Sequence, residues 1–142
     1  MLIRACKDRL GGVPVEVRAT VLADVMTTDV LTVSGGATLS QAARAMRSRN
    51  VGSAIVIDPD TCPIGIITER ELVDSVASSR NPDHGTVELW MKPEPATASP
   101  DMLPIAAAEL MREHSVRQLP VTESGKLVGV VSIRDLLVSA QR

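Results

Sequence analysis

The sequence predicts a mixed α/β fold built from two copies of one strand–helix–strand–strand–helix unit. Three observations lead to this fold class. The second half of the chain repeats the first, apolar residues recur at helical spacing in both halves, and two short apolar runs joined by a turn follow each helical stretch. The chain has 142 residues, is 44% hydrophobic and 23% charged, and therefore has the composition of an ordinary globular protein rather than a disordered one.

The repeat becomes visible when the chain is shifted by 65 residues along itself. Met26 then falls on Met91, and Met46 falls on Met111. After the turn over residues 58–65 the shift is one residue smaller, and turns absorb single insertions at little cost. The matches indicate an internal duplication that runs from about residue 19 to residue 140.

This duplication divides the chain into four expected parts. An N-terminal extension covers residues 1–18, the first copy 19–80, a polar linker 81–85 and the second copy 86–142. A unit of roughly 60 residues is only marginally stable alone, so we expect the two copies to pack together as one body.

Each copy begins with an expected strand followed by a helix. The strands are expected at Val30–Val33 and at Ala96–Ala98. Pro104 falls in the first turn of the second helix, where a missing N–H breaks no hydrogen bond. The two helices are predicted from apolar residues that share one helical face: Leu39, Ala42, Ala43 and Met46 in the first copy, and Leu103, Ala107, Leu110 and Met111 in the second.

A buried hairpin follows each helix. Its strands are expected at Ala54–Ile57 and Ile64–Ile67, and again at Gln118–Val121 and Leu127–Val131. Pro120 interrupts one of these strands, and because proline has no N–H it should occupy an edge or a bulge.

The last helix of each copy begins at a motif that carries chemistry, Thr68-x-x-Glu71 in the first copy and Ser132-x-x-Asp135 in the second. Unpaired N–H groups and the positive end of the helix dipole attract anions there, and the hydroxyl adds a donor for phosphate. The carboxylate can accept hydrogen bonds from the two hydroxyls of a ribose. The same spacing also forms a helix capping box, which needs no ligand, so both interpretations stay open.

These segments resemble a known family. The duplicated unit, with Gly-Ile-Ile-Thr-Glu-Arg-Glu-Leu at 65–72 and Gly-Val-Val-Ser-Ile-Arg-Asp-Leu at 129–136, is similar to a tandem pair of CBS domains, named for cystathionine β-synthase and also called a Bateman module. The segments Ala23–Met26 and His114–Val121 support the resemblance, which covers about residues 19–140.

The resemblance implies two copies related by a pseudo-two-fold axis, with an adenosine compound (AMP, ADP, ATP, NAD or S-adenosylmethionine) bound in the cleft between them. The backbone at residues 31–32 and 96–97 would bind the edge of the base. Because the family prefers Asp where Glu71 stands, the first site is expected to be weak, altered or empty. The side chains implied to bind are Thr68 and Ser132 at phosphate, Glu71 and Asp135 at ribose, Arg70 and Arg134 near phosphate, and Val51 and Val116 at adenine.

The side chains beside the two motifs are also open to roles that involve no ligand. Arg70 and Arg134 would serve equally as solvated helix charges, and Val51 and Val116 as simple core residues. His114 is a candidate for a contact to phosphate at the rim of the cleft.

The family implies a stand-alone regulatory module rather than an enzyme. No nucleophile–base pair is visible, no catalytic residue is assigned, and no cofactor is expected beyond the regulatory ligand. The signal would pass in trans, to an unidentified protein partner or through the homodimer that many members form. The alternative is a structural or interaction module that binds no ligand.

Composition excludes other classes of partner. Aromatic residues make up 1% of the chain, with Trp90 the only one, and the net charge is −2, so neither base-stacking rings nor a strongly basic face is available for nucleic acid. Trp90 is expected to anchor the linker segment. No apolar run reaches the ~20 residues of a membrane span.

The few cysteines and histidines bear on the cellular location and on metal binding. Cys6 and Cys62 stand apart and suggest a reducing, cytoplasmic location. His84 and His114 lack the neighbours that a metal site needs, so no metal is expected.

Overall fold

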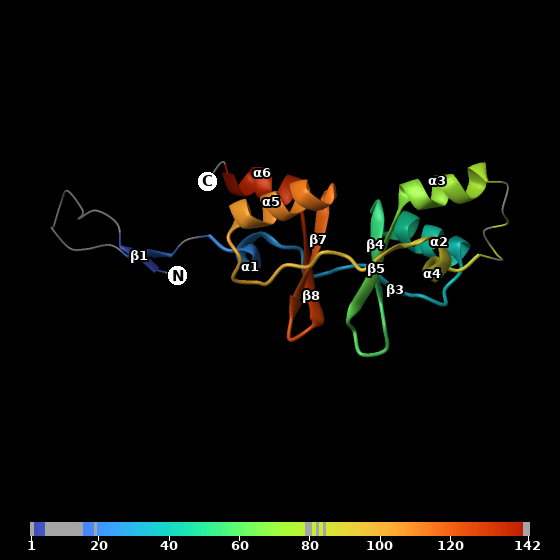
Figure 1. The fold of residues 1–142 in the computed structure, drawn as a ribbon, viewed down its shortest axis with the longest axis horizontal. Helices are drawn as coiled ribbons and strands as arrows, with labels where there is room; N and C mark the ends of the chain where they lie inside the picture. Colours follow the sequence, from blue (N-terminus) through green and yellow to red (C-terminus); the bar gives the residue numbers. More distant parts are fainter. Residues whose placement is uncertain are drawn as a thin grey trace.

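The computed structural model has the mixed α/β architecture that the sequence predicts, with two lobes whose hairpins meet in the middle of the molecule (Figure 1). Helices α2, α3 and α4 belong to one lobe, and α1, α5 and α6 to the other. The structure describes residues 2–4, 16–18, 20–78, 81, 83 and 85–140.

The element order repeats as the sequence indicates. A short antiparallel pair, β1 (Leu2–Arg4) and β2 (Glu16–Arg18), precedes the first copy. The first copy contains α1 (Leu22–Val25), β3 (Thr32–Ser34), α2 (Leu39–Arg49), β4 (Ser53–Ile57), β5 (Pro63–Thr68) and α3 (Glu69–Ala77). The second copy contains α4 (Val87–Trp90), β6 (Lys92–Pro93), α5 (Pro104–His114), β7 (Gln118–Glu123), β8 (Lys126–Ser132) and α6 (Ile133–Ala140).

Both predicted long helices are confirmed, and their ends follow local chemistry. The Thr38 hydroxyl accepts from the backbone N–H of Gln41 at 3.1 Å, and the Gln41 side chain accepts from the Thr38 N–H at 2.9 Å, which closes a capping box at the start of α2. Helix α5 begins with Pro104, as expected. Asn50 and Ser115 end the two helices in the left-handed conformation, both with φ of 54°.

The predicted hairpins are confirmed, whereas the expected first strands are only partly correct. β3 begins at Thr32, two residues later than expected, and runs parallel to β4. The expected strand at Ala96–Ala98 is wrong, because Ala98 alone forms a bridge to Val121. Pro100, two residues after Ala98, lacks the N–H group that would extend this ladder.

Pro120 occupies an edge position, in agreement with the sequence prediction. Its carbonyl accepts from the Ala98 N–H at 2.9 Å on the side away from β8, where only that single bridge forms. The proline nitrogen faces the same side, so the β7–β8 ladder loses no donor.

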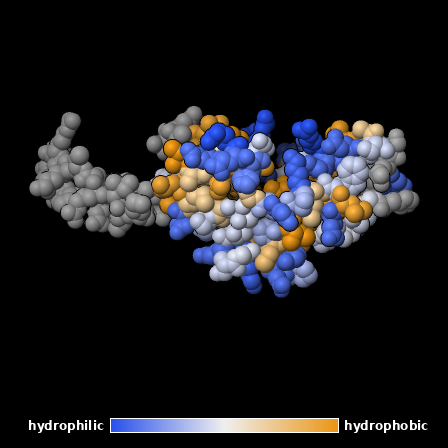
Figure 2. All heavy atoms as spheres, in the orientation of Figure 1, coloured by the Kyte–Doolittle hydropathy of each residue, from blue (hydrophilic) through white to orange (hydrophobic). Residues whose placement is uncertain are grey.

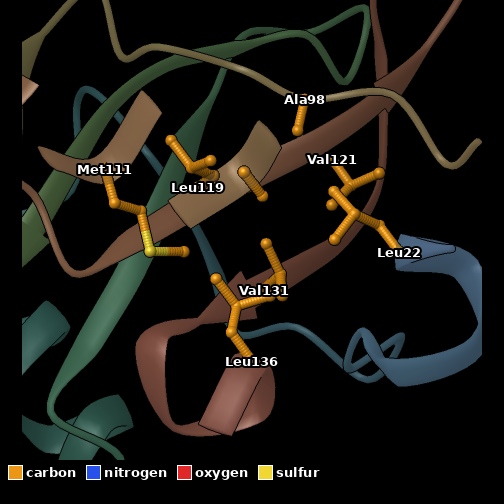
Figure 3. Close-up of a cluster of buried hydrophobic side chains, with 8 residues drawn as sticks. Leu22, Ala98, Met111, Leu119, Val121, Val131 and Leu136 are labelled. Carbon is orange, nitrogen blue, oxygen red and sulfur yellow. The ribbon is translucent and has the colours of Figure 1, made fainter. Parts of the chain in front are cut away.

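The short helix that precedes each copy packs into the core of the other copy. Leu22 of α1 lies fully buried with Val121, Val131 and Leu136 of the second copy (Figure 3). Val87 of α4 is likewise fully buried in the core of the first copy. The two halves of the sequence therefore exchange segments, and neither core is complete without the other copy.

Two glycines mark where the exchanged segments cross the hairpins. Met26 packs over Gly129, where an added Cβ would lie 2.7 Å from its sulfur, and the following Thr27 pairs with Val130 through two 2.9 Å backbone hydrogen bonds. In the other half Met91 packs over Gly65, and the following β6 pairs with β5.

Trp90, at the end of α4, lies directly before Met91. It is half-buried and packs against the core of the first copy, as expected for a residue that anchors the linker segment.

Leu22→Ala tests the exchange of segments. Because Leu22 is fully buried in the other copy's core, we expect the free energy of unfolding to fall by about 2–5 kcal/mol, measured by urea denaturation. Leu89→Ala is the matched control, since Leu89 in α4 is 78% exposed and its truncation should change stability by less than about 0.5 kcal/mol. Equal effects in the two variants would contradict the packing.

Gly65→Ala tests the close crossing of the hairpin. The new Cβ would lie 3.0 Å from the Lys92 carbonyl oxygen and within contact of Met91, so we expect a loss of about 1–3 kcal/mol in thermal or chemical denaturation. Gly36→Ala is the control, because no atom lies within 4 Å of its added Cβ. A Gly65 variant as stable as the Gly36 variant would show that the crossing is loose.

Candidate functional site

Two clefts lie between the copies, and residues of both copies line each of them. The first, called here the Asp135 cleft, has a volume of about 550 Å³ and includes Leu31, Val51, Ser132, Arg134 and Asp135. The second, called here the Thr68 cleft, has a volume of about 770 Å³ and includes Thr68, Arg70, Lys92, His114 and Val116. Figure 2 shows the notch between the two lobes, with hydrophilic residues on both of its sides.

The residues shared by both clefts lie at equivalent positions of the two copies. They are Gly52 and Ser53 from the first copy and Arg117 and Gln118 from the second. The Ser53 hydroxyl donates a 2.6 Å hydrogen bond to the side-chain oxygen of Gln118. Equivalent residues can contact each other only at a symmetry axis, so this bond marks the pseudo-two-fold axis and separates the two clefts.

The Asp135 cleft places a carboxylate at the first turn of a helix. β8 runs directly into α6, which brings Ser132 and Asp135 to the cleft wall. One Asp135 oxygen, Oδ2, accepts from the Ser132 N–H at 2.8 Å, and the Ser132 hydroxyl accepts from the Asp135 N–H at 3.3 Å. Among the described residues no hydrogen bond is formed by the other oxygen, Oδ1, which leaves it available to a ligand.

The part of the Asp135 cleft wall that the first copy supplies combines apolar side chains with the polar Thr27, Asp29, Asn50 and Ser53. Val30, Leu31 and Val51 line it, and Val51 is 38% exposed rather than part of the core. The Leu31 carbonyl accepts from the Ile55 N–H at 3.0 Å and is therefore already used by the sheet, while Thr32 lies outside the cleft. A flat apolar group fits this wall without an aromatic ring.

The equivalent carboxylate of the first copy, that of Glu71, does not line the Thr68 cleft. Glu71 is only 6% exposed. Its Oε2 accepts from the Thr68 N–H at 2.7 Å and from the Thr68 hydroxyl. Both carboxylates accept from the N–H of their own cap residue, but Glu71 also accepts from the Thr68 hydroxyl and is buried, whereas Asp135 is half-buried and lines its cleft, so the two motifs form different surfaces.

Positive charge is present in both clefts. Arg117 and Arg134 line the Asp135 cleft with Asp29, whose side chain also forms an exposed ion pair with Arg49 at 3.1 Å. The Thr68 cleft contains Arg70, Lys92 and Arg117 together with Glu69 and Glu94, and His114 lies at its wall. Each cleft therefore offers cations to an anionic group.

The structure distributes the eight predicted site residues over both clefts. Val51, Ser132, Arg134 and Asp135 meet in one cleft, Thr68, Arg70 and Val116 in the other, and Glu71 in neither. Sequence reasoning did not select Arg117, Gln118, Ser53, Thr27 or Lys92. The signal that could have found Arg117 and Ser53 is their place one or two residues after Val116 and Val51.

The expectations about cysteines, histidines, metal ions and membrane spans can be compared with the described residues only. Cys6 and His84 lie outside the described residues. In the part of the chain that the structure describes, no three His, Cys, Asp or Glu side chains are grouped to hold a metal ion. No helix in those same ranges is long and apolar enough to cross a membrane.

Comparison with known proteins identifies the family. The CBS domain model matches the chain twice, over residues 22–78 and 87–141. The chain therefore belongs to the CBS-domain family and carries two CBS domains in tandem.

Relatives share most of this chain. A 17.7 kDa protein of Acidianus ambivalens is 40% identical over 119 residues, which is 83% of this chain and 71% of that protein. The CBS domain-containing protein YhcV of Bacillus subtilis is 33% identical over 116 residues and 82% of both chains. A homoserine O-acetyltransferase of Methanococcoides burtonii is 33% identical over 118 residues, which make up 82% of this chain and only 23% of that enzyme.

Solved structures confirm the fold of the pair. A putative signal-transduction protein with CBS domains from Burkholderia ambifaria matches with a TM-score of 0.78 and 30% identity, over 85% of this chain and 93% of that one. The CBS domain pair of MJ0100, in complex with 5′-methylthioadenosine and S-adenosylmethionine, matches with a TM-score of 0.78 and 21% identity over 88% and 100% of the two chains. CBSX2 in complex with AMP matches with a TM-score of 0.72 and 22% identity, over 85% of this chain and 96% of that one.

Thr68→Ala tests the closed cap at the start of α3. Because the hydroxyl interacts with Glu71 and accepts from the Arg70 N–H at 3.3 Å, we expect the free energy of unfolding to fall by about 1 kcal/mol in chemical denaturation. The exposed Thr28→Ala serves as control and should be neutral. An unchanged Thr68 variant would mean that the cap contributes nothing and that its residues are free for a ligand.

Proposed function

We propose that this chain is a regulatory CBS pair that binds an adenosine-containing ligand in the Asp135 cleft and signals in trans. The observation that carries the proposal is the Asp135 carboxylate, which lies at the first turn of α6 and lines the same cleft as the apolar Leu31 and Val51 of the other copy. A ribose and a base require these two surfaces at neighbouring places.

The chemistry of the cleft suits each part of such a ligand. A carboxylate accepts hydrogen bonds from two adjacent ribose hydroxyls, and Oδ1 of Asp135 is available for them. The base would lie against Val51 and Leu31. A phosphate, or another anionic group, would lie at the N-terminus of α6 beside Arg134. A volume of about 550 Å³ lies within the range of small-molecule sites.

The comparisons support the ligand class. Among structures of the same fold, the MJ0100 pair binds 5′-methylthioadenosine and S-adenosylmethionine, and CBSX2 binds AMP. These compounds share the adenosine group and differ in everything attached to it. Adenosine is therefore the common element that we carry over, and AMP, ADP, ATP, NAD and S-adenosylmethionine all remain candidates for this chain.

The Thr68 cleft is proposed as the weaker of two sites. Glu71 is only 6% exposed and does not line this cleft, so a ribose here would have no exposed carboxylate to bind unless Glu71 left its buried position. Val116, Arg70 and the Ala96 backbone remain available there for base and phosphate, whereas Thr97 lies outside the cleft.

Signalling follows from the construction of the clefts. Because each wall comes from a different copy, a ligand that touches both walls binds one relative placement of the copies better than any other and shifts the population toward it. We propose that the output is read by a partner or by a homodimer. Val73 of α3 and Leu137 of α6 occupy equivalent positions and are 64% and 62% exposed, which offers an apolar contact for either.

A regulatory role, rather than catalysis, is the simplest one for these clefts, in the cytoplasmic location that the sequence suggests. The match to the homoserine O-acetyltransferase covers a minor part of that enzyme, so it does not by itself bring an activity to this chain.

A ligand-free interaction module is the second candidate. It is favoured by the two capping boxes, since Thr68 with Glu71 and Ser132 with Asp135 are internally hydrogen-bonded without any ligand. In this case the exposed apolar residues would be the functional surface.

A thermal-shift panel of adenosine compounds separates the two candidates. A ligand at ~100 times its dissociation constant should stabilise the protein by about 2.7 kcal/mol, which raises the melting temperature by several degrees. Absence of any shift at millimolar concentration would support the ligand-free module.

Asp135→Ala should remove most of the ligand-induced shift, whereas Glu71→Ala should remove less. Both substitutions break a cap, so the quantity to compare is the shift between free and bound protein within each variant. An equal loss in both variants would contradict the assignment of the stronger site to the Asp135 cleft.

A further inference from the structure

We infer that Arg117 serves whichever cleft holds a phosphorylated ligand, so that tight binding in one cleft weakens binding in the other. This inference rests on the proposed function, because it concerns anionic ligands of the same two clefts. Its starting point is that Arg117 lines the Asp135 cleft and the Thr68 cleft alike.

The second copy has an arginine beside the pseudo-two-fold axis, and the first copy has no arginine at the equivalent position. The position equivalent to Arg117 in the first copy is Gly52. The backbones at these positions match, because the Gly52 carbonyl accepts from the Glu69 N–H at 3.1 Å and the Arg117 carbonyl accepts from the Ile133 N–H at 2.9 Å. The backbone near the axis is therefore symmetric, while the cationic side chain is present on one side only.

Competition follows from the chemistry of one guanidinium. Arg117 is exposed, and its side chain is not held by any ion pair within the described residues. Its planar fork binds phosphate oxygens through two parallel hydrogen bonds, and a side chain turned into one cleft to form them is turned away from the cleft on the other side of the Ser53–Gln118 bond. A second phosphorylated ligand then has only the cations of its own cleft, Arg134 on one side or Arg70 and Lys92 on the other.

Isothermal titration of the full chain with AMP measures this competition. We expect a first binding step and a second step that is at least tenfold weaker. Arg117→Ala should lower the AMP affinity of the first step at least tenfold, because the first ligand binds this arginine. The affinity of the second step should change less than threefold, because the second ligand does not contact Arg117 in the unaltered chain. Adenosine is the matched neutral probe, and its affinity should change less than twofold in the same variant.

The Asp135→Ala background distinguishes a shared arginine from one that belongs to a single cleft. In this variant AMP occupies the Thr68 cleft first, and Arg117 is free to serve it. Adding Arg117→Ala should then weaken AMP binding at least tenfold. An arginine that belonged only to the Asp135 cleft would leave this affinity unchanged.

Gly52→Arg adds the missing guanidinium and provides a gain-of-function test. An added Cβ at Gly52 lies at an ordinary contact distance of 3.5 Å from the Glu69 side chain, so there is room for the substitution. The second AMP should then bind at least threefold more tightly. Arg112→Ala is the control, since this exposed residue of α5 lines neither cleft.

The outcomes separate the two proposals. Failure of AMP, ADP, ATP, NAD and S-adenosylmethionine alike to bind the unaltered chain overturns the proposed function, and this inference with it. Failure of the phosphorylated compounds alone overturns the inference. AMP binding that is equally tight in both steps overturns the inference and the proposal that the Thr68 cleft is the weaker site, but leaves the proposed binding of an adenosine compound intact. The inference is also overturned by an Asp135→Ala chain, shown to be folded by circular dichroism, that binds no AMP or binds it equally with and without Arg117.

Discussion

The crossing of each exchanged segment over the other copy's hairpin is the contact on which the rest of the molecule depends. Met26 lies over Gly129 and Met91 over Gly65, at distances that leave no room for a Cβ. These crossings bring α1 and α4 into the opposite cores and fix how the two hairpins approach each other. A unit that would be only marginally stable alone thereby gains a core that the pair completes.

The clefts are a consequence of this arrangement. Because the hairpins meet at an axis marked by the bond between Ser53 and Gln118, the strand-to-helix turn of each copy lines a different cleft, together with residues of the other copy. The backbone on the two sides is nearly equivalent, as the helix-start bonds to Gly52 and Arg117 show. Differences between the clefts are then matters of side chains, and a duplicated fold presents two unlike sites without any change of architecture.

Sequence reasoning succeeded where the signal is local. The α2 and α5 helices, both hairpins, the Pro104 start and the edge position of Pro120 follow from spacing and from the missing proline N–H. It failed at Ala96–Ala98, which is equivalent to a strand of the first copy but is flanked by prolines. Only Ala98 in this segment forms a β-bridge, and its partner is Val121. It also gave no sign of the segment exchange, because a four-residue helix such as α1 is too short to show a period.

For the site, the sequence by itself determined which chemical groups are available. The spacing of Thr68 with Glu71 and of Ser132 with Asp135 sets each carboxylate one helical turn from a hydroxyl, and the absence of aromatic rings except Trp90 leaves aliphatic walls for a base. Only the tertiary structure decided which carboxylate faces a cleft and that Arg117 lines both clefts. The physical reason is that side-chain reach and contacts across the axis depend on how the copies pack, and residues 65 positions apart in sequence meet there.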